Sequence, residues 1–136
     1  MNPHELKVLL PSGWPRPKGY ANGVTARGRM VFVAGMIGWD AQGVFPSDDF
    51  AAQARQALEN VVAVLREAGA KPEHIVRMTW YITDRDEYLA AGREVGAIYR
   101  EMLGRNFPTM AVVIVAGLIE RAAKLEIETT AVVPEQ

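Results

Sequence analysis

Residues 47–82 read SDDFAAQARQALENVVAVLREAGAKPEHIVRMTWYI. After two aspartates, apolar residues recur at intervals of three and four, which predicts an amphipathic helix with acidic side chains at its positive end. Gly69 stands where such a helix commonly ends. Residues 75–82 then alternate between two sets of side chains, which is typical of a strand. The stretch therefore predicts a helix that leads into a strand.

The segments on either side of this unit predict further strands and a second helix. A capping pattern formed by Asp84 and Glu87 opens that helix, and Gly104 ends it. The order β-β-β-α-β-α-β-β indicates an α+β fold in which one mixed sheet carries two helices on one face. Each helix is long enough to connect strands that pair in parallel. The remaining strands are predicted at 5–10, at two pieces of 24–34 around a turn at 27–29, at 110–115 and at 124–133.

Two of these strands are apolar at every position, namely 30–34 and 110–115. Two helices can cover only one face of the sheet, so the other face of these strands would remain bare in a single chain. Burying apolar surface is favourable by roughly 25 cal/mol per Å², and large exposed apolar patches mark interaction surfaces. We therefore expect a homo-oligomer that packs through the helix-free face.

Length and composition exclude several classes of protein. For 136 residues we expect one domain over 1–136, in which residues 1–19 form an N-terminal strand and a Pro/Gly-rich loop. The net charge of −1 lacks the basic excess of a nucleic-acid binder, and the absence of cysteine excludes disulfides and thiolate metal sites. The most apolar run, 110–119, is about half the length of a membrane-spanning helix. We expect a cytoplasmic protein without membrane contact.

Few residues suggest chemistry by themselves. No phosphate-loop, dinucleotide-binding or serine-hydrolase pattern is present, and the only histidines, His4 and His74, do not suggest a metal or cofactor site. Glu126 and Glu128 share one face of a strand, either as solvated side chains or as carboxylates that line a cleft and move protons. Trp39 either lines a ligand site or stacks on its own loop.

Five segments, taken together and in order, resemble the RidA (YjgF) family of reactive-intermediate deaminases. They are residues 31–37, 53–61, 77–84, 107–109 and 124–128. The resemblance implies a trimer of chorismate-mutase-like subunits with ligand clefts between them. Active members of the family hydrolyse imines and enamines to a ketone and ammonia, and need no metal or cofactor.

The resemblance transfers site residues unevenly. Tyr20 matches the cleft tyrosine, Glu126 the glutamate that positions or activates water, and Gly35 the turn glycine whose backbone faces the ligand. Met110 stands where active members have an arginine that clamps the substrate carboxylate, and Met36 stands where they have a glutamine. A thioether cannot replace the bidentate hydrogen bonds of a guanidinium. The implied cleft is therefore more apolar than usual.

Arg93 lies near a position where the family often has a polar helix residue. It is either a replacement cation for the missing arginine or an ordinary solvated helix residue. Three functions remain open: a divergent imine or enamine hydrolase for a bulkier substrate, a non-catalytic trimer that binds a small molecule, and the family's older label of ribonuclease or translation inhibitor. The near-neutral charge makes the third the least favoured.

Overall fold

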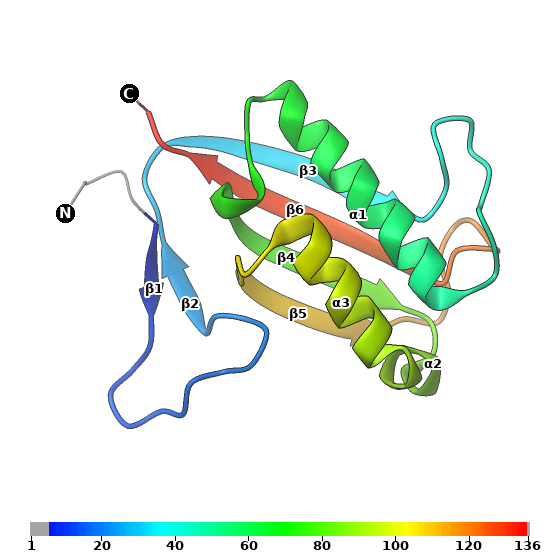
Figure 1. Ribbon diagram of the computed structural model, residues 1–136, viewed down its shortest axis with the longest axis horizontal. Coiled ribbons are helices and arrows are strands. Elements are labelled where there is room, and N and C mark those ends of the chain that lie inside the picture. The colour runs from blue at the N-terminus through cyan, green and yellow to red at the C-terminus, as the bar shows by residue number, and fades with distance from the viewer. Residues whose placement is uncertain (1–5, 136) are drawn as a thin grey trace.

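The structure is a computed structural model that describes residues 6–135 (Figure 1). His4 and Glu5, which figured in the sequence analysis, lie outside the described residues. The elements are β1 (Lys7–Leu9), β2 (Gly23–Thr25), β3 (Arg29–Ile37), α1 (Phe50–Glu67), the 3-10 turn η1 (Pro72–His74), β4 (Ile75–Ile82), α2 (Arg85–Ala90), α3 (Gly92–Leu103), β5 (Thr109–Ile114) and β6 (Leu125–Val133).

The main sheet has four strands in the order β3-β6-β4-β5. β6 is antiparallel to both β3 and β4, and β4 is parallel to β5. The parallel pair is joined by α2 and α3, and α1 and α3 lie on the same face of the sheet (Figure 1). The predicted α+β fold with a mixed sheet and helices on one face is confirmed. The second helix differs in one respect, because it is divided at Ala91 into α2 and α3.

The predicted turn at residues 27–29 does not form a hairpin. β2 pairs with β1 in a separate two-stranded sheet, and β3 pairs with β6. Gly28 has a φ of 149°, and a Cβ there would overlap the carbonyl of Val133. This close approach, which glycine alone permits, carries the chain from the small sheet into the large one. The single predicted sheet is therefore two sheets.

The core lies between the main sheet and the helices. Met78, Trp80 and Ile82 of β4 are buried on this side, while Thr79 and Tyr81 between them are half-buried on the other side. α1 begins at the N-cap Asp49, whose carboxylate accepts a hydrogen bond from Ala52 N at 3.0 Å. The core residues of α1 are Phe50, Ala51, Ala54, Ala57, Leu58, Val61 and Leu65.

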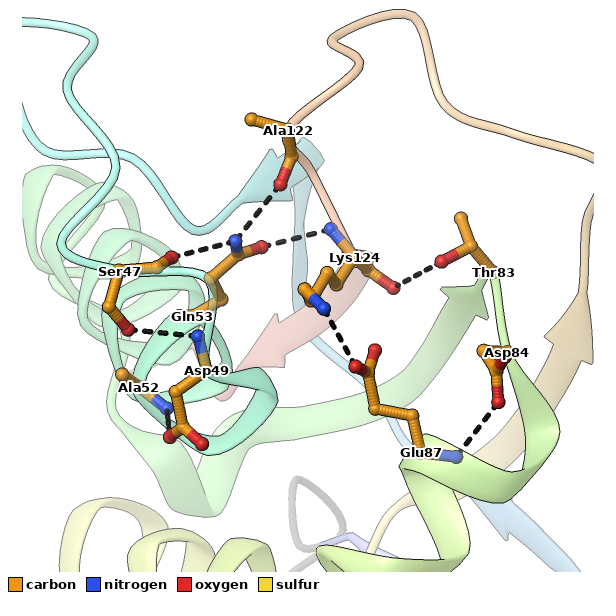
Figure 2. Close-up of polar contacts among 9 residues, drawn as sticks. All are labelled: Ser47, Asp49, Ala52, Gln53, Thr83, Asp84, Glu87, Ala122 and Lys124. Atoms are coloured by element: carbon orange, nitrogen blue, oxygen red, sulfur yellow. Dashed lines mark hydrogen bonds and ion pairs between the residues drawn. The ribbon is translucent and has the colours of Figure 1, made fainter.

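Gln53 is fully buried and connects α1 to the loop before β6 (Figure 2). Its Nε2 donates to the carbonyls of Ser47 and Ala122, both at 3.0 Å, and its Oε1 accepts from Lys124 N at 2.9 Å. The Lys124 side chain in turn pairs with Glu87 of α2 at 2.7 Å, and this hydrogen bond raises the pKa of Lys124. These contacts hold the 115–124 loop beside the starts of α1 and α2.

The helix-free face of the main sheet is apolar and open in the single chain. Phe32 and Met30 of β3 are 70% and 58% exposed, while Val33 of the same strand faces the helices and is buried. Val113 of β5 also lies on this exposed side, next to Tyr81 of β4. The strands that the sequence analysis expected to be buried on both faces, 30–34 and 110–115, are thus covered by helices on one face only. In the part of the chain that is described, no helix is long and apolar enough to cross a membrane.

Candidate functional site

Glu126 lies on the helix-free face of β6. Its neighbours Leu125 and Ile127 are completely buried on the other side, so strand alternation directs the Glu126 carboxylate away from the core. The carboxylate lies against the backbone of β3, since a Cβ at Gly35 would be 2.5 Å from Glu126 Oε2. The structure therefore brings together Glu126 and Gly35, two of the site residues expected from the sequence.

A second carboxylate and a phenol extend this polar strip. The Tyr81 hydroxyl donates to Glu128 Oε1 at 3.2 Å. That hydrogen bond raises the pKa of Tyr81, and the charges of Glu128 and Glu126 act in the same direction, while Arg77 opposes them. Sequence reasoning did not single out Tyr81. Its alternation with buried Trp80 could have placed it on the face of Glu126 and Glu128.

Met110 lies on the opposite face of the sheet. It is in register with buried Met78 of β4 and packs against the core on the helix side. There it lines a cavity of about 340 Å³ between β5 and the helices α2 and α3. The lining consists of Gly19, Trp80, Tyr88, Leu89, Gly92, Val95, Gly96, Tyr99, Arg100, Phe107 and Met110.

Met110 and Glu126 of one chain cannot touch the same small ligand. They lie on opposite faces, and their strands β5 and β6 are separated by β4, a distance of roughly 10 Å across the sheet. A site that uses both residues therefore needs two copies of the chain.

Tyr20 is partly exposed and lines a neighbouring cavity of about 450 Å³. Arg16 and Arg105 line the same cavity, and the Phe107 ring borders both this cavity and that of Met110. The chain is held here by Ala21, whose N–H donates to the Pro108 carbonyl at 2.9 Å. Tyr20 and Met110 are thus close neighbours.

Two other expected site residues are engaged in packing. Met36 is half-buried and packs against the core from β3. The Trp39 ring lies 5.9 Å from the Phe45 ring at 44°, and the Trp39 carbonyl accepts from Asn60 Nδ2 at 2.8 Å. The Trp39 ring therefore contacts Phe45 of its own loop, and neither Met36 nor Trp39 lines the Met110 cavity.

Arg93 is exposed on α3 and does not line the Met110 cavity either. Arg100, two turns further along the same helix, does line it. Gly92, Gly96 and Arg100 follow one another at intervals of four, which places them on one helix face. The sequence analysis missed this spacing. A glycine inside a helix, such as Gly96, destabilises the helix by about 0.5–1 kcal/mol relative to alanine, so its presence indicates a local requirement for space.

A sequence profile of the family described as Endoribonuclease L-PSP matches residues 15–133. The chain belongs to the RidA (YjgF) family. This RidA-family chain is 36% identical over 113 residues to the 2-iminobutanoate/2-iminopropanoate deaminase of Salmonella typhimurium. The matched segment covers 83% of this chain and 86% of the Salmonella protein.

Solved structures of the RidA family confirm the fold. A Yersinia pestis protein of the conserved Rid family, YyfB, whose function is unknown, superimposes with a TM-score of 0.81 at 29% identity and covers 95% of this chain and 99% of its own. Escherichia coli TdcF with bound serine has a TM-score of 0.67 at 35% identity, with coverage of 93% and 98%. The resemblance expected from the sequence is therefore confirmed as family membership.

Proposed function

We propose that this chain is a divergent RidA-family hydrolase, which converts a reactive imine or enamine to a ketone and ammonia at clefts between subunits. The observation that carries the proposal is the Glu126 carboxylate, held over the Gly35 backbone on an open face of the sheet. Membership of a family that includes 2-iminobutanoate/2-iminopropanoate deaminases supports the choice of reaction.

In this proposal Glu126 acts as the general base. A carboxylate within hydrogen-bond reach of a water molecule can orient it and accept its proton as the oxygen attacks the carbon of the C=N bond. The carbinolamine that results loses ammonia and leaves a ketone, so one water is consumed for each ammonia released. Tyr20 contacts the ligand, and Gly35 presents its backbone to it.

The cleft is proposed to lie between copies of the chain in a homotrimer. The opposite placement of Met110 and Glu126 supports this, because a second copy is needed to bring them to one ligand. The exposed Phe32 and Met30 support it independently, because association through the helix-free face removes them from water.

Met110 changes the expected substrate. It offers no hydrogen bond to a carboxylate where a guanidinium would offer two charge-assisted ones. We therefore propose a substrate with a bulkier apolar body than 2-iminopropanoate. Met110 also favours the second candidate, a trimer that binds such a molecule without turnover. Ribonuclease activity is not proposed, because a net charge of −1 provides little attraction for a phosphate backbone.

The test uses imines made in place by an amino-acid oxidase from alanine, leucine and phenylalanine. We expect this chain to accelerate ammonia release from the leucine and phenylalanine imines more than from the alanine imine. Glu126→Gln should remove the acceleration. Glu128→Gln, on the same face of the same strand, is the matched control and should retain most of it.

Two results would decide against hydrolysis. Binding of the corresponding keto acids without any acceleration would leave the non-catalytic binder as the function. Equal acceleration by Glu126→Gln and the unmodified chain would exclude Glu126 as the base.

A further inference from the structure

The cavity beside Met110 is lined mainly by apolar and aromatic residues, together with one cationic side chain. Its lining includes the aromatic rings of Trp80, Tyr88, Tyr99 and Phe107, and Arg100 is the one charged residue among the described residues that line it. The Tyr99 and Phe107 rings stack with centroids 6.0 Å apart. Burial raises the pKa of both Tyr88 and Tyr99 above the usual value of a phenol, which is already neutral at physiological pH. A ligand here meets an apolar wall and a single positive charge.

Arg100 is available to a ligand. Within residues 6–135 its guanidinium forms no ion pair and no side-chain hydrogen bond, whereas Arg55 on the neighbouring helix is paired with Glu101 at 2.8 Å. The guanidinium lies against Gly96, where a Cβ would be 3.4 Å from Arg100 Nη1. Glycine at this position lets the long side chain lie back along the helix toward the cavity.

Trp80 provides an independent sign of a missing partner. Its side chain is 3% exposed and lines the same cavity, and its Nε1 has no hydrogen-bond acceptor among the described residues. Buried donors are nearly always paired, so an unpaired one calls for an explanation. A ligand oxygen would supply the acceptor. The buried indole N–H calls for an acceptor, and the Arg100 guanidinium, on an exposed residue that lines the same cavity, favours an acceptor that carries negative charge.

We propose that Arg100 is the carboxylate anchor of this chain and that the cavity selects monocarboxylates with an aromatic or branched apolar body. The anchor thus stands on helix α3, while Met110 on strand β5 contributes apolar wall. This inference rests on the proposed function, because it gives the substrate class of the same site. The volume of about 340 Å³ lies at the lower end of the range for small-molecule sites.

The nearest competing cations belong to other surroundings. Arg93 and Arg100 are both exposed on α3, but only Arg100 lines the cavity. Arg16 and Arg105 line the adjacent cavity with Tyr20, beyond the Phe107 ring. If one of these arginines were the anchor, its substitution and not that of Arg100 would abolish carboxylate binding. Single substitutions therefore distinguish Arg100 from them.

Calorimetric titration with stable probes tests the anchor. Phenylacetate, its uncharged analogue phenylacetamide, and acetate are titrated into the full chain. We expect phenylacetate to bind at least about tenfold more tightly than phenylacetamide, as a hydrogen bond to a charged group provides, and acetate to bind far more weakly than phenylacetate. Arg100→Gln should abolish the preference for the charged probe, and Arg100→Lys should retain part of it.

Arg93→Gln is the matched control on the same helix and should bind like the unmodified chain, as should Arg105→Gln. The proposal is overturned if Arg100→Gln keeps the preference, if Arg105→Gln loses it, or if the unmodified chain shows no preference. Circular dichroism establishes that each variant is folded.

The outcome is separable from that for hydrolysis. Glu126→Gln should keep the preference for phenylacetate even though it loses turnover. A chain that binds phenylacetate through Arg100 but accelerates no imine would retain this inference and lose the hydrolase. Turnover of imines without any preference for the charged probe would retain the hydrolase and overturn the anchor.

Discussion

Gly35 and Glu126 depend on each other at the level of single atoms. The Glu126 carboxylate occupies the space in which any other residue at 35 would place its Cβ. The same pair explains why a glycine in a strand, which ordinarily weakens it, is present beside the bulge between Val33 and Met36. Room for the carboxylate is the reason for this glycine.

Substituting Gly35 should therefore displace the carboxylate. We expect Gly35→Ala to destabilise the fold by about 1–3 kcal/mol through overpacking, and to impair the activity assigned to Glu126. Adding Glu126→Asp, which shortens the side chain, should recover part of the stability. Denaturant unfolding of the single and double variants measures the coupling. Strictly additive effects would contradict the contact.

Gln53 shows how one side chain joins separate elements. Sequence reasoning placed it within a helical signature but assigned it no contact, because its partners are at Ser47, Ala122 and Lys124. Two of these lie about seventy residues away, so helix periodicity could not reveal them. The three hydrogen bonds determine where the loop before β6 meets α1 (Figure 2).

Removing this connection should be costly. Gln53→Leu keeps the approximate size of the side chain but leaves the backbone groups of Ser47, Ala122 and Lys124 without this partner, so we expect a loss of about 2–4 kcal/mol in unfolding free energy. Gln56→Leu is the control, because Gln56 bonds only to Asn60 one turn away in the same helix. It should cost less than about 1 kcal/mol. Urea unfolding of both variants makes the comparison, and equal losses would contradict the role of Gln53.

At the scale of the whole molecule, the open sheet face is the dominant feature. The helices cover one side of the main sheet, and Phe32, Met30 and Val113 remain exposed on the other. The continuous apolar runs at 30–34 and 110–115 predicted this in outline, since apolar strands with only two helices leave one face uncovered. Which residues face which side depended on strand register, and the separate pairing of β1 with β2 was not foreseen.

A charge on this face should prevent association. We expect Phe32→Glu to shift the protein from the proposed trimer toward monomers in sedimentation velocity, because burying an unpaired carboxylate is unfavourable. Val64→Glu introduces the same charge at an exposed apolar position of α1 and should leave the assembly unchanged. A Phe32→Glu protein that sediments like the unmodified chain would argue against association through this face.

The sequence alone determined the order of elements, the family and the apolar strands, because these follow from local periodicity and from motifs read along the chain. It also identified Glu126, Gly35 and Met110 as residues of interest. Tertiary structure decided which of them can cooperate, since strand pairing places Met110 and Glu126 on opposite faces of one sheet. It also decided that Arg100 and not Arg93 lines the Met110 cavity, because the face that a helix turns toward a cavity depends on how the helix packs.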